Sequence, residues 1–162
     1  KRQVVKGGSV VTAGNSSSLN DGASAVIVAS ERAVTKYGLN ARGRVVDGAS
    51  AGLAPEIMGL GPVPASEKVL ERAGWNAGDL GSVEINEAFA TQSLASIRRL
   101  GLDPEIVNRD GGAIALGHPL GSSGSRIVIT LLGRMEREQT AKGLATMCIG
   151  VGQGAALLVE RV

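Results

Sequence analysis

The chain has 162 residues, enough for one domain that buries about 70% of the surface its unfolded chain exposes. Hydrophobic residues make up 43%, and the single cysteine excludes an internal disulfide. A net charge of +2, with only three aromatic side chains for stacking, argues against nucleic-acid binding. No apolar run approaches the ~20 residues of a membrane span and no secretory segment opens the sequence, so we expect a soluble, cytoplasmic protein.

Five short apolar runs have the composition of β-strands. The first, ASAVIVA over residues 23–29, lacks polar alternation, as is typical of a strand buried on both faces. The other four lie at residues 44–49, 82–85, 144–149 and 155–159. Because only five residues, 150–154, join the last two runs, these are predicted to pair antiparallel. We therefore expect a five-stranded sheet with mixed strand directions.

Helical patterns lie between these runs. Three of them end at a glycine, which favours a left-handed C-terminal cap: 31–37 at Gly38, 65–73 at Gly74 and 88–100 at Gly101. Ser30 is the expected N-cap of the first, and a Gly/Pro-rich loop is expected over 50–64. A fourth helix follows, with Ser122 or Ser123 as its expected N-cap. Its apolar face at helical spacing is formed by Val128, Leu131, Leu132 and Met135.

This order of elements predicts one α/β domain with helices on both faces of the sheet. Residues 1–8 are expected to be a tail or an interdomain segment. Because the chain begins at Lys1 and not at methionine, it is expected to be part of a longer protein.

The only histidine, His118, lies in the glycine-rich run over residues 111–126 that leads into the fourth helix. Such a bend can present an imidazole and backbone N–H groups to a carbonyl or phosphate oxygen. His118 can equally be a hydrogen-bonded loop residue. The run lacks the Gly-Lys-Ser/Thr ending of a P-loop, and the glycines at 150–154 join strand to strand, so neither common nucleotide motif is present.

Cys148 and Asn86 are two further candidates. Cys148 ends a predicted strand and is either a small buried apolar residue or a thiol made accessible by the glycines that follow. Asn86 follows another strand, where ligands gather in open α/β sheets. It can also simply cap the next helix while Phe89 fills the core. One histidine and one cysteine cannot form a zinc site alone, so no metal is expected.

Taken together, these segments resemble the C-terminal half of the thiolase family, acyl-CoA acyltransferases that make or cleave 3-oxoacyl-CoA. The matching stretches are GNSSSLNDGASAVIVASE (14–31), GPVPASEKVLERAGW (61–75), VEINEAFA (83–90), GGAIALGHPLGSSGSRI (111–127) and CIGVGQG (148–154). They cover nearly the whole chain, and the histidine and cysteine motifs are far more specific together than alone. The resemblance implies a layered α/β, thiolase-like C-terminal domain.

The resemblance also implies a role for each motif. Asn86 and His118 would bind an ordered water and the thioester oxygen, forming an oxyanion hole for the enolate of the second acyl-CoA. Cys148 would be the acid or base that exchanges the α-proton, and the backbone N–H of Gly150 would contribute to a second oxyanion hole. Coenzyme A thioesters are then substrates, and no cofactor is expected.

Three positions match substrate-binding residues of the family: Ser17 for the pantetheine arm, Met58 for the pocket lining, and Phe89. The chain departs from the family pattern at Asp110, Val151 and Gln153, which leaves the preferred acyl chain open. Short-chain acetoacetyl-CoA and β-ketoadipyl-CoA both remain possible substrates.

One family component is missing from the sequence. Thiolases use a second, nucleophilic cysteine that belongs to the N-terminal half. The residues alone would permit Cys148 as nucleophile with His118 as its base, but the resemblance assigns Cys148 to proton transfer instead. The chain alone is therefore expected to be inactive, and the full-length form is expected to be a homodimer or homotetramer.

Two other classes of function remain open. One is a non-catalytic module that binds coenzyme A or lipid on a thiolase-like fold. The other is a scaffold that associates with itself through exposed sheet edges or an uncovered face.

Overall fold

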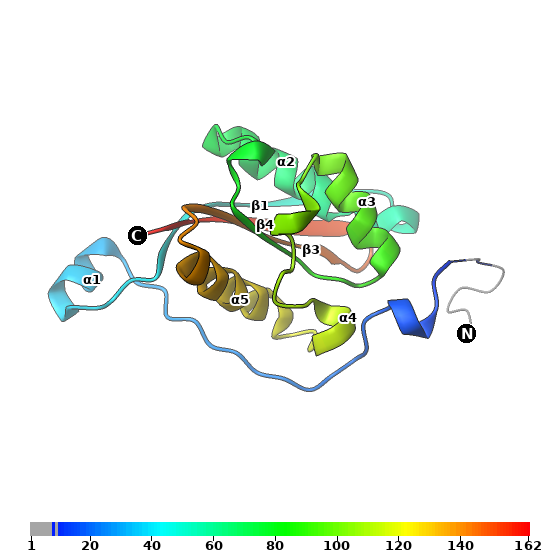
Figure 1. Ribbon diagram of the computed structural model, residues 1–162, viewed down its shortest axis with the longest axis horizontal. Helices are drawn as coiled ribbons and strands as arrows, with labels where there is room; N and C mark the ends of the chain where they lie inside the picture. The colour runs from blue at the N-terminus through cyan, green and yellow to red at the C-terminus, as the bar shows by residue number, and fades with distance from the viewer. Residues whose placement is uncertain (1–7, 9) are drawn as a thin grey trace.

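The computed structural model describes residue 8 and residues 10–162 and centres on a four-stranded mixed sheet (Figure 1). Most of the segment predicted as a tail, over 1–8, lies outside the described residues. The strands are β1 (Gly43–Gly52), β2 (Ser82–Ile85), β3 (Lys142–Ile149) and β4 (Gln153–Arg161). They lie in the order β1-β4-β3-β2. β2 and β3 are parallel, whereas β4 pairs antiparallel with both β3 and β1.

The predicted antiparallel pair at the C-terminus is confirmed. Ile149 pairs with Gln153, so only Gly150, Val151 and Gly152 form the turn between β3 and β4. Val151 has a φ of 67° and Gly152 a φ of 86°. A left-handed conformation is unusual for a β-branched residue, so the turn places Val151 under backbone strain.

The helices agree closely with the sequence pattern. They are α1 (Glu31–Tyr37), α2 (Pro62–Ala73), α3 (Ala90–Leu100), α4 (Ala113–Leu116) and α5 (Ser123–Glu138), with the 3-10 turns η1 (Ala13–Asn15), η2 (Pro55–Leu60), η3 (Ala77–Asp79) and η4 (Pro104–Ile106). The three glycine caps are confirmed, with left-handed φ angles at Gly38, Gly74 and Gly101. Among residues 8 and 10–162, no helix has both the length and the apolar composition to cross a membrane.

Two local predictions are corrected. The segment 50–64 is not one loop, because β1 continues to Gly52, η2 follows, and α2 begins at Pro62. Proline suits the first position of a helix, where its missing N–H is not needed. Ser122 occupies the position before α5 but makes no side-chain capping bond, whereas Ser30 caps α1 by accepting from the Ala33 N–H at 3.3 Å.

Helices cover both faces of the sheet (Figure 1). Leu144 and Leu158 pack with side chains of α2 and α3 on one face. Their neighbours Ala145 and Val159 point to the other face and pack against α5. This alternation explains why β3 and β4 are apolar along most of their length: both faces of these central strands are covered.

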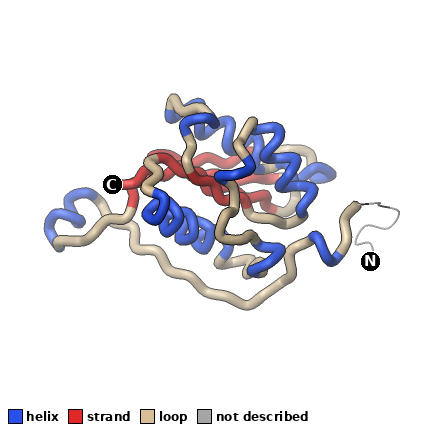
Figure 2. Tube along the Cα trace, viewed as in Figure 1, coloured by secondary structure: helices blue, strands red, loops and turns tan. Residues whose placement is uncertain are grey.

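The prediction of a fifth strand over residues 23–29 is wrong. The segment forms no ladder, and Ile27 and Val28 remain 89% and 85% exposed. Figure 2 shows it as an extended loop that runs past α5 without joining the sheet. A β-branched run favours an extended backbone, but a strand also needs a neighbouring strand to bond its N–H and C=O groups. The observed sheet therefore has four strands.

Candidate active site

Asn86 lies where β2 ends, and its backbone N–H donates to the Thr146 carbonyl of β3 at 3.0 Å. The residue is fully buried, yet neither Oδ1 nor Nδ2 of its side chain has a hydrogen-bond partner among the described residues. Leaving a buried amide unsatisfied costs about 1–3 kcal/mol. A group that remains unpaired at this cost points to a ligand or water site.

Cys148 lies at the same edge of the sheet. β2 and β3 run parallel with Ile85 opposite Thr146, so the carboxyl ends of both strands, carrying Asn86 and Cys148, lie on one side. Cys148 is 6% exposed. Burial raises the pKa of its thiol, and a backbone hydrogen bond partly opposes this shift. The thiol is therefore protonated at neutral pH.

The His118 loop is held by a segment from the other end of the chain. The His118 backbone N–H donates to the Ser18 carbonyl and to Oδ1 of Asn20, both at 3.1 Å. Ser17 in turn donates its N–H to the Ala88 carbonyl at 3.1 Å, two residues after Asn86. Residues 17–20 therefore connect the Asn86 turn to the His118 loop, and the predicted substrate residue Ser17 lies between them.

Glu87 provides a second connection between the turn that carries Asn86 and the loop that carries His118. Its carboxylate accepts from the Ile114 N–H at 3.1 Å, in the short helix before His118, and from Nδ2 of Asn108 at 3.1 Å. A Cβ added to Gly112 would lie 2.0 Å from the carboxyl carbon of Glu87, so any larger residue there would displace this carboxylate from its present position.

Asn108 completes this connection by bonding to the backbone of β2, the outermost strand on that side of the sheet. Its side chain accepts from the N–H of Ile85 and donates to the carbonyl of Ile85, both at 2.8 Å. Asn108 thus occupies the place of a further strand beside β2 and fixes the turn that carries Asn86. Sequence reasoning did not select Glu87 or Asn108 as functional; the only available indication was the position of Glu87 directly after Asn86.

The imidazole of His118 is half-buried, and its Nδ1 lies 2.6 Å from Oγ of Ser123. Burial, with a smaller contribution from the positive charge of Arg126, lowers the pKa of His118. The ring is therefore neutral at neutral pH, with one nitrogen that can donate and one that can accept.

Near this ring, the buried carboxyl of Glu84 faces the half-buried guanidinium of Arg126, with 3.9 Å between Oε2 and Nη1. Burial raises the pKa of Glu84 to about 8, opposed by Arg126 and reinforced by Asp110 and Glu87. The Glu84 carboxyl is therefore mostly protonated at neutral pH. The positive charge of Arg126 disfavours protonation of the His118 imidazole.

The remaining predicted residues lie around this centre. Phe89 is half-buried directly before α3 and forms an isolated β-bridge with Ser16. Gly150 is exposed in the β3–β4 turn, with open space where a side chain would lie. Met58 is half-buried in η2, a segment that contacts β3 and β4. Leu53, two residues before η2, donates its N–H to the Gly152 carbonyl at 2.8 Å.

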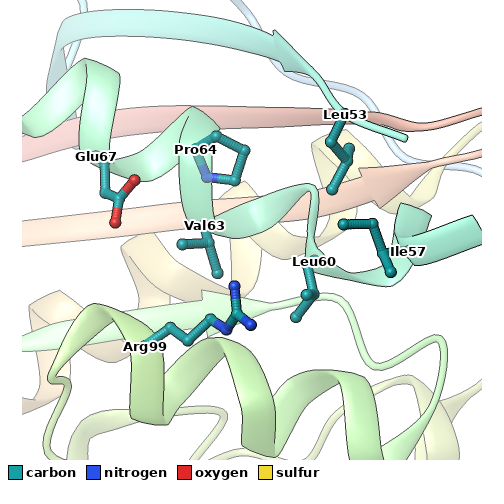
Figure 3. A pocket seen from close by; sticks show the side chains of 7 residues that line it. All are labelled: Leu53, Ile57, Leu60, Val63, Pro64, Glu67 and Arg99. Carbon is teal, nitrogen blue, oxygen red and sulfur yellow. The ribbon is translucent and has the colours of Figure 1, made fainter. Parts of the chain in front are cut away.

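Two surface depressions lie near these elements. One of about 510 Å³, shown in Figure 3, is lined by side chains of η2, α2 and α3 and contains none of the predicted site residues. The other, of about 630 Å³, is lined by residues 19–22 and 119–121. Because these segments flank His118 in space and in sequence, the second depression is the one that adjoins the candidate site.

Residues 39–161 match the protein family described as "Thiolase, C-terminal domain". The chain therefore belongs to the thiolase family, as the motifs predicted. It is 58% identical over 151 residues to an acetyl-CoA acetyltransferase of Paracoccus denitrificans, covering 93% of this chain and 39% of that protein. It is also 58% identical over 154 residues to a β-ketoadipyl-CoA thiolase of Pseudomonas putida, covering 94% of this chain and 38% of the relative.

A crystal structure of human mitochondrial 3-ketoacyl-CoA thiolase in complex with CoA has the same fold, with a TM-score of 0.92 and 49% identity. That similarity covers 94% of this chain and 38% of the human protein. The chain thus spans about two fifths of the length of the relatives it matches.

Proposed function

We propose that this chain is the C-terminal catalytic half of an acyl-CoA C-acyltransferase, which condenses acetyl-CoA with an acyl-CoA or cleaves 3-oxoacyl-CoA by thiolysis. The observation that carries the proposal is the buried, unpartnered amide of Asn86, at the sheet edge shared with Cys148. The names of the relatives, acetyl-CoA acetyltransferase and β-ketoadipyl-CoA thiolase, support the substrate class.

In the condensation direction, the Cys148 thiolate removes a proton from the α-carbon of acetyl-CoA and becomes a thiol. The negative charge then moves to the thioester oxygen, which accepts a hydrogen bond from His118 and one from a water held by Asn86. Preorganised donors of this kind are worth about 3 kcal/mol each in a site shielded from water. The enolate carbon attacks an acyl group carried by a cysteine of the N-terminal half.

That attack expels the nucleophilic cysteine as a thiolate and releases 3-oxoacyl-CoA. During it, the backbone N–H of Gly150 donates to the carbonyl oxygen of the acyl group. In thiolysis the same steps run backwards, and the Cys148 thiol returns a proton to the α-carbon. Ser17, Met58 and Phe89 contact the substrate in this proposal, and the active form is a homodimer or homotetramer.

The test compares the chain alone with a chimera in which it replaces the corresponding segment of the Paracoccus denitrificans acetyl-CoA acetyltransferase. We expect the chain alone to show no acetoacetyl-CoA thiolysis above background, because its single cysteine is assigned to proton transfer. The chimera is expected to turn over, because it regains a nucleophile. Cys148-dependent turnover by the chain alone, or a folded chimera without activity, would contradict the proposal.

A further inference from the structure

Ser123 is fully buried at the first position of α5 and contacts the His118 ring. Its Oγ lies 2.6 Å from Nδ1 of His118 and 3.1 Å from the carbonyl oxygen of Pro119. A serine hydroxyl has one hydrogen, so it can donate to only one of these two acceptors. The choice decides which nitrogen of the neutral ring carries the proton.

The two arrangements have opposite chemical consequences. If Ser123 donates to Nδ1, the ring proton lies on Nε2, and the free side of His118 is a hydrogen-bond donor. If Ser123 instead donates to Pro119, then Nδ1–H donates to Oγ, and Nε2 is a bare acceptor. The first form can stabilise an oxyanion, whereas the second can only act as a base.

The Pro119 carbonyl decides between the two. It already accepts the backbone N–H groups of Ser122 and Ser123, both at 2.8 Å. A carbonyl oxygen has two lone pairs, and these two donors occupy them at shorter distances than the 3.1 Å contact with Oγ. The Ser123 hydroxyl therefore donates its hydrogen to Nδ1, the acceptor at the shorter distance of 2.6 Å.

We propose that Ser123 is a positioning residue that donates to Nδ1 of His118 and holds the ring in the tautomer that carries its proton on Nε2. The catalytic consequence rests on the proposed function, because it matters only if His118 binds an oxyanion. The tautomer itself follows from the contacts of Ser123 and Pro119 and can be measured independently of activity.

Long-range proton–nitrogen NMR of the ¹⁵N-labelled chain tests the tautomer directly. His118 is the only histidine, so both ring nitrogen signals are assigned without ambiguity. At pH 8, where the ring is neutral, we expect Nε2 to resonate as a protonated nitrogen and Nδ1 as a bare one. The wild-type spectrum alone overturns the inference if Nδ1 carries the proton.

The variant Ser123→Ala removes the donor, and the two nitrogen signals are expected to move toward each other as the second tautomer becomes populated. Ser125→Ala is the matched control, because its hydroxyl bonds Ser24 and the Ser122 carbonyl and does not contact His118. It should leave both signals in place. Unchanged signals in a folded Ser123→Ala variant would also overturn the inference.

In the active chimera, Ser123→Ala should lower kcat by roughly ten- to a hundredfold with little change in KM, the scale for groups that orient a functional imidazole. Ser125→Ala should retain the parent kcat. The two proposals can fail separately. An inactive chimera with the expected wild-type spectrum contradicts the proposed function alone. Nδ1 protonation in an active chimera contradicts the role of Ser123, and with it the assignment of His118 as an oxyanion donor, but leaves the proposed acyl transfer standing.

Discussion

Replacing His118 with alanine in the active chimera should lower kcat/KM for acetoacetyl-CoA thiolysis by a hundredfold or more. The imidazole is neutral because burial lowers its pKa, and its assigned task is to donate to the enolate oxygen. Losing one such donor costs about 3 kcal/mol, which corresponds to a rate loss of about this size. Steady-state kinetics at saturating and limiting acetoacetyl-CoA would measure the loss.

Leu116→Ala is a suitable control for this variant. Leu116 ends the short helix α4, two residues before His118, is 58% exposed and belongs to none of the contacts described for the site. It should retain the activity of the parent chimera. If His118→Ala also proceeds at nearly the parental rate while remaining folded, the assignment of His118 as an oxyanion donor is wrong.

Cys148→Ala should lower the turnover of the chimera by about 10²- to 10⁴-fold, the range expected for loss of a positioned acid or base. The buried thiol has a raised pKa, so it is protonated at neutral pH and ready to donate in thiolysis. The same raised pKa predicts that condensation, which needs the thiolate, becomes faster as the pH rises toward the pKa of the thiol.

Mass spectrometry separates this role from that of a nucleophile. If Cys148 exchanges protons, Cys148→Ala in the chimera should still become acetylated by acetyl-CoA, on the cysteine of the N-terminal half. A covalent acyl group found on Cys148 of the unsubstituted chimera would instead show that Cys148 is the nucleophile. That result would restore the alternative in which His118 is its base.

Secondary-structure elements that depend on residues close in the sequence were predicted well. The span of β2 and the glycine-terminated helices follow from short patterns and from caps a few residues away. The antiparallel pairing of β3 and β4 followed from the short connection between them. In each case the cap, the apolar run or the short connection that determines the element lies within or directly beside it in the sequence.

The run over 23–29 shows where local sequence patterns are insufficient. Its composition indicates an extended backbone, and the segment is indeed extended, but composition cannot say which strand it pairs with. Among the described residues no strand accompanies it, and it precedes the part of the chain, 39–161, that matches the C-terminal thiolase domain. Strand pairing is a non-local property, and local sequence patterns do not contain it.

The same distinction holds for the site. His118, Asn86 and Cys148 could be proposed from the sequence because their motifs are specific in combination. The residues that hold them in place were not predicted. Glu87 acquires its role only when the Gly112 loop folds against it, and Ser123, five residues after His118, has the sequence signature of a helix cap. The Glu87 contact joins residues 27 positions apart through the tertiary fold and leaves little trace in the spacing of the sequence.

The central claim is that Asn86 and His118 jointly bind the oxygen on which negative charge develops. A crystal structure of the chimera with acetoacetyl-CoA, in which Cys148→Ala slows turnover, tests it most directly. We predict the thioester oxygen within hydrogen-bond distance of Nε2 of His118 and of a water held by the Asn86 amide. A structure in which protein groups satisfy that amide and the thioester oxygen lies away from His118 would contradict it.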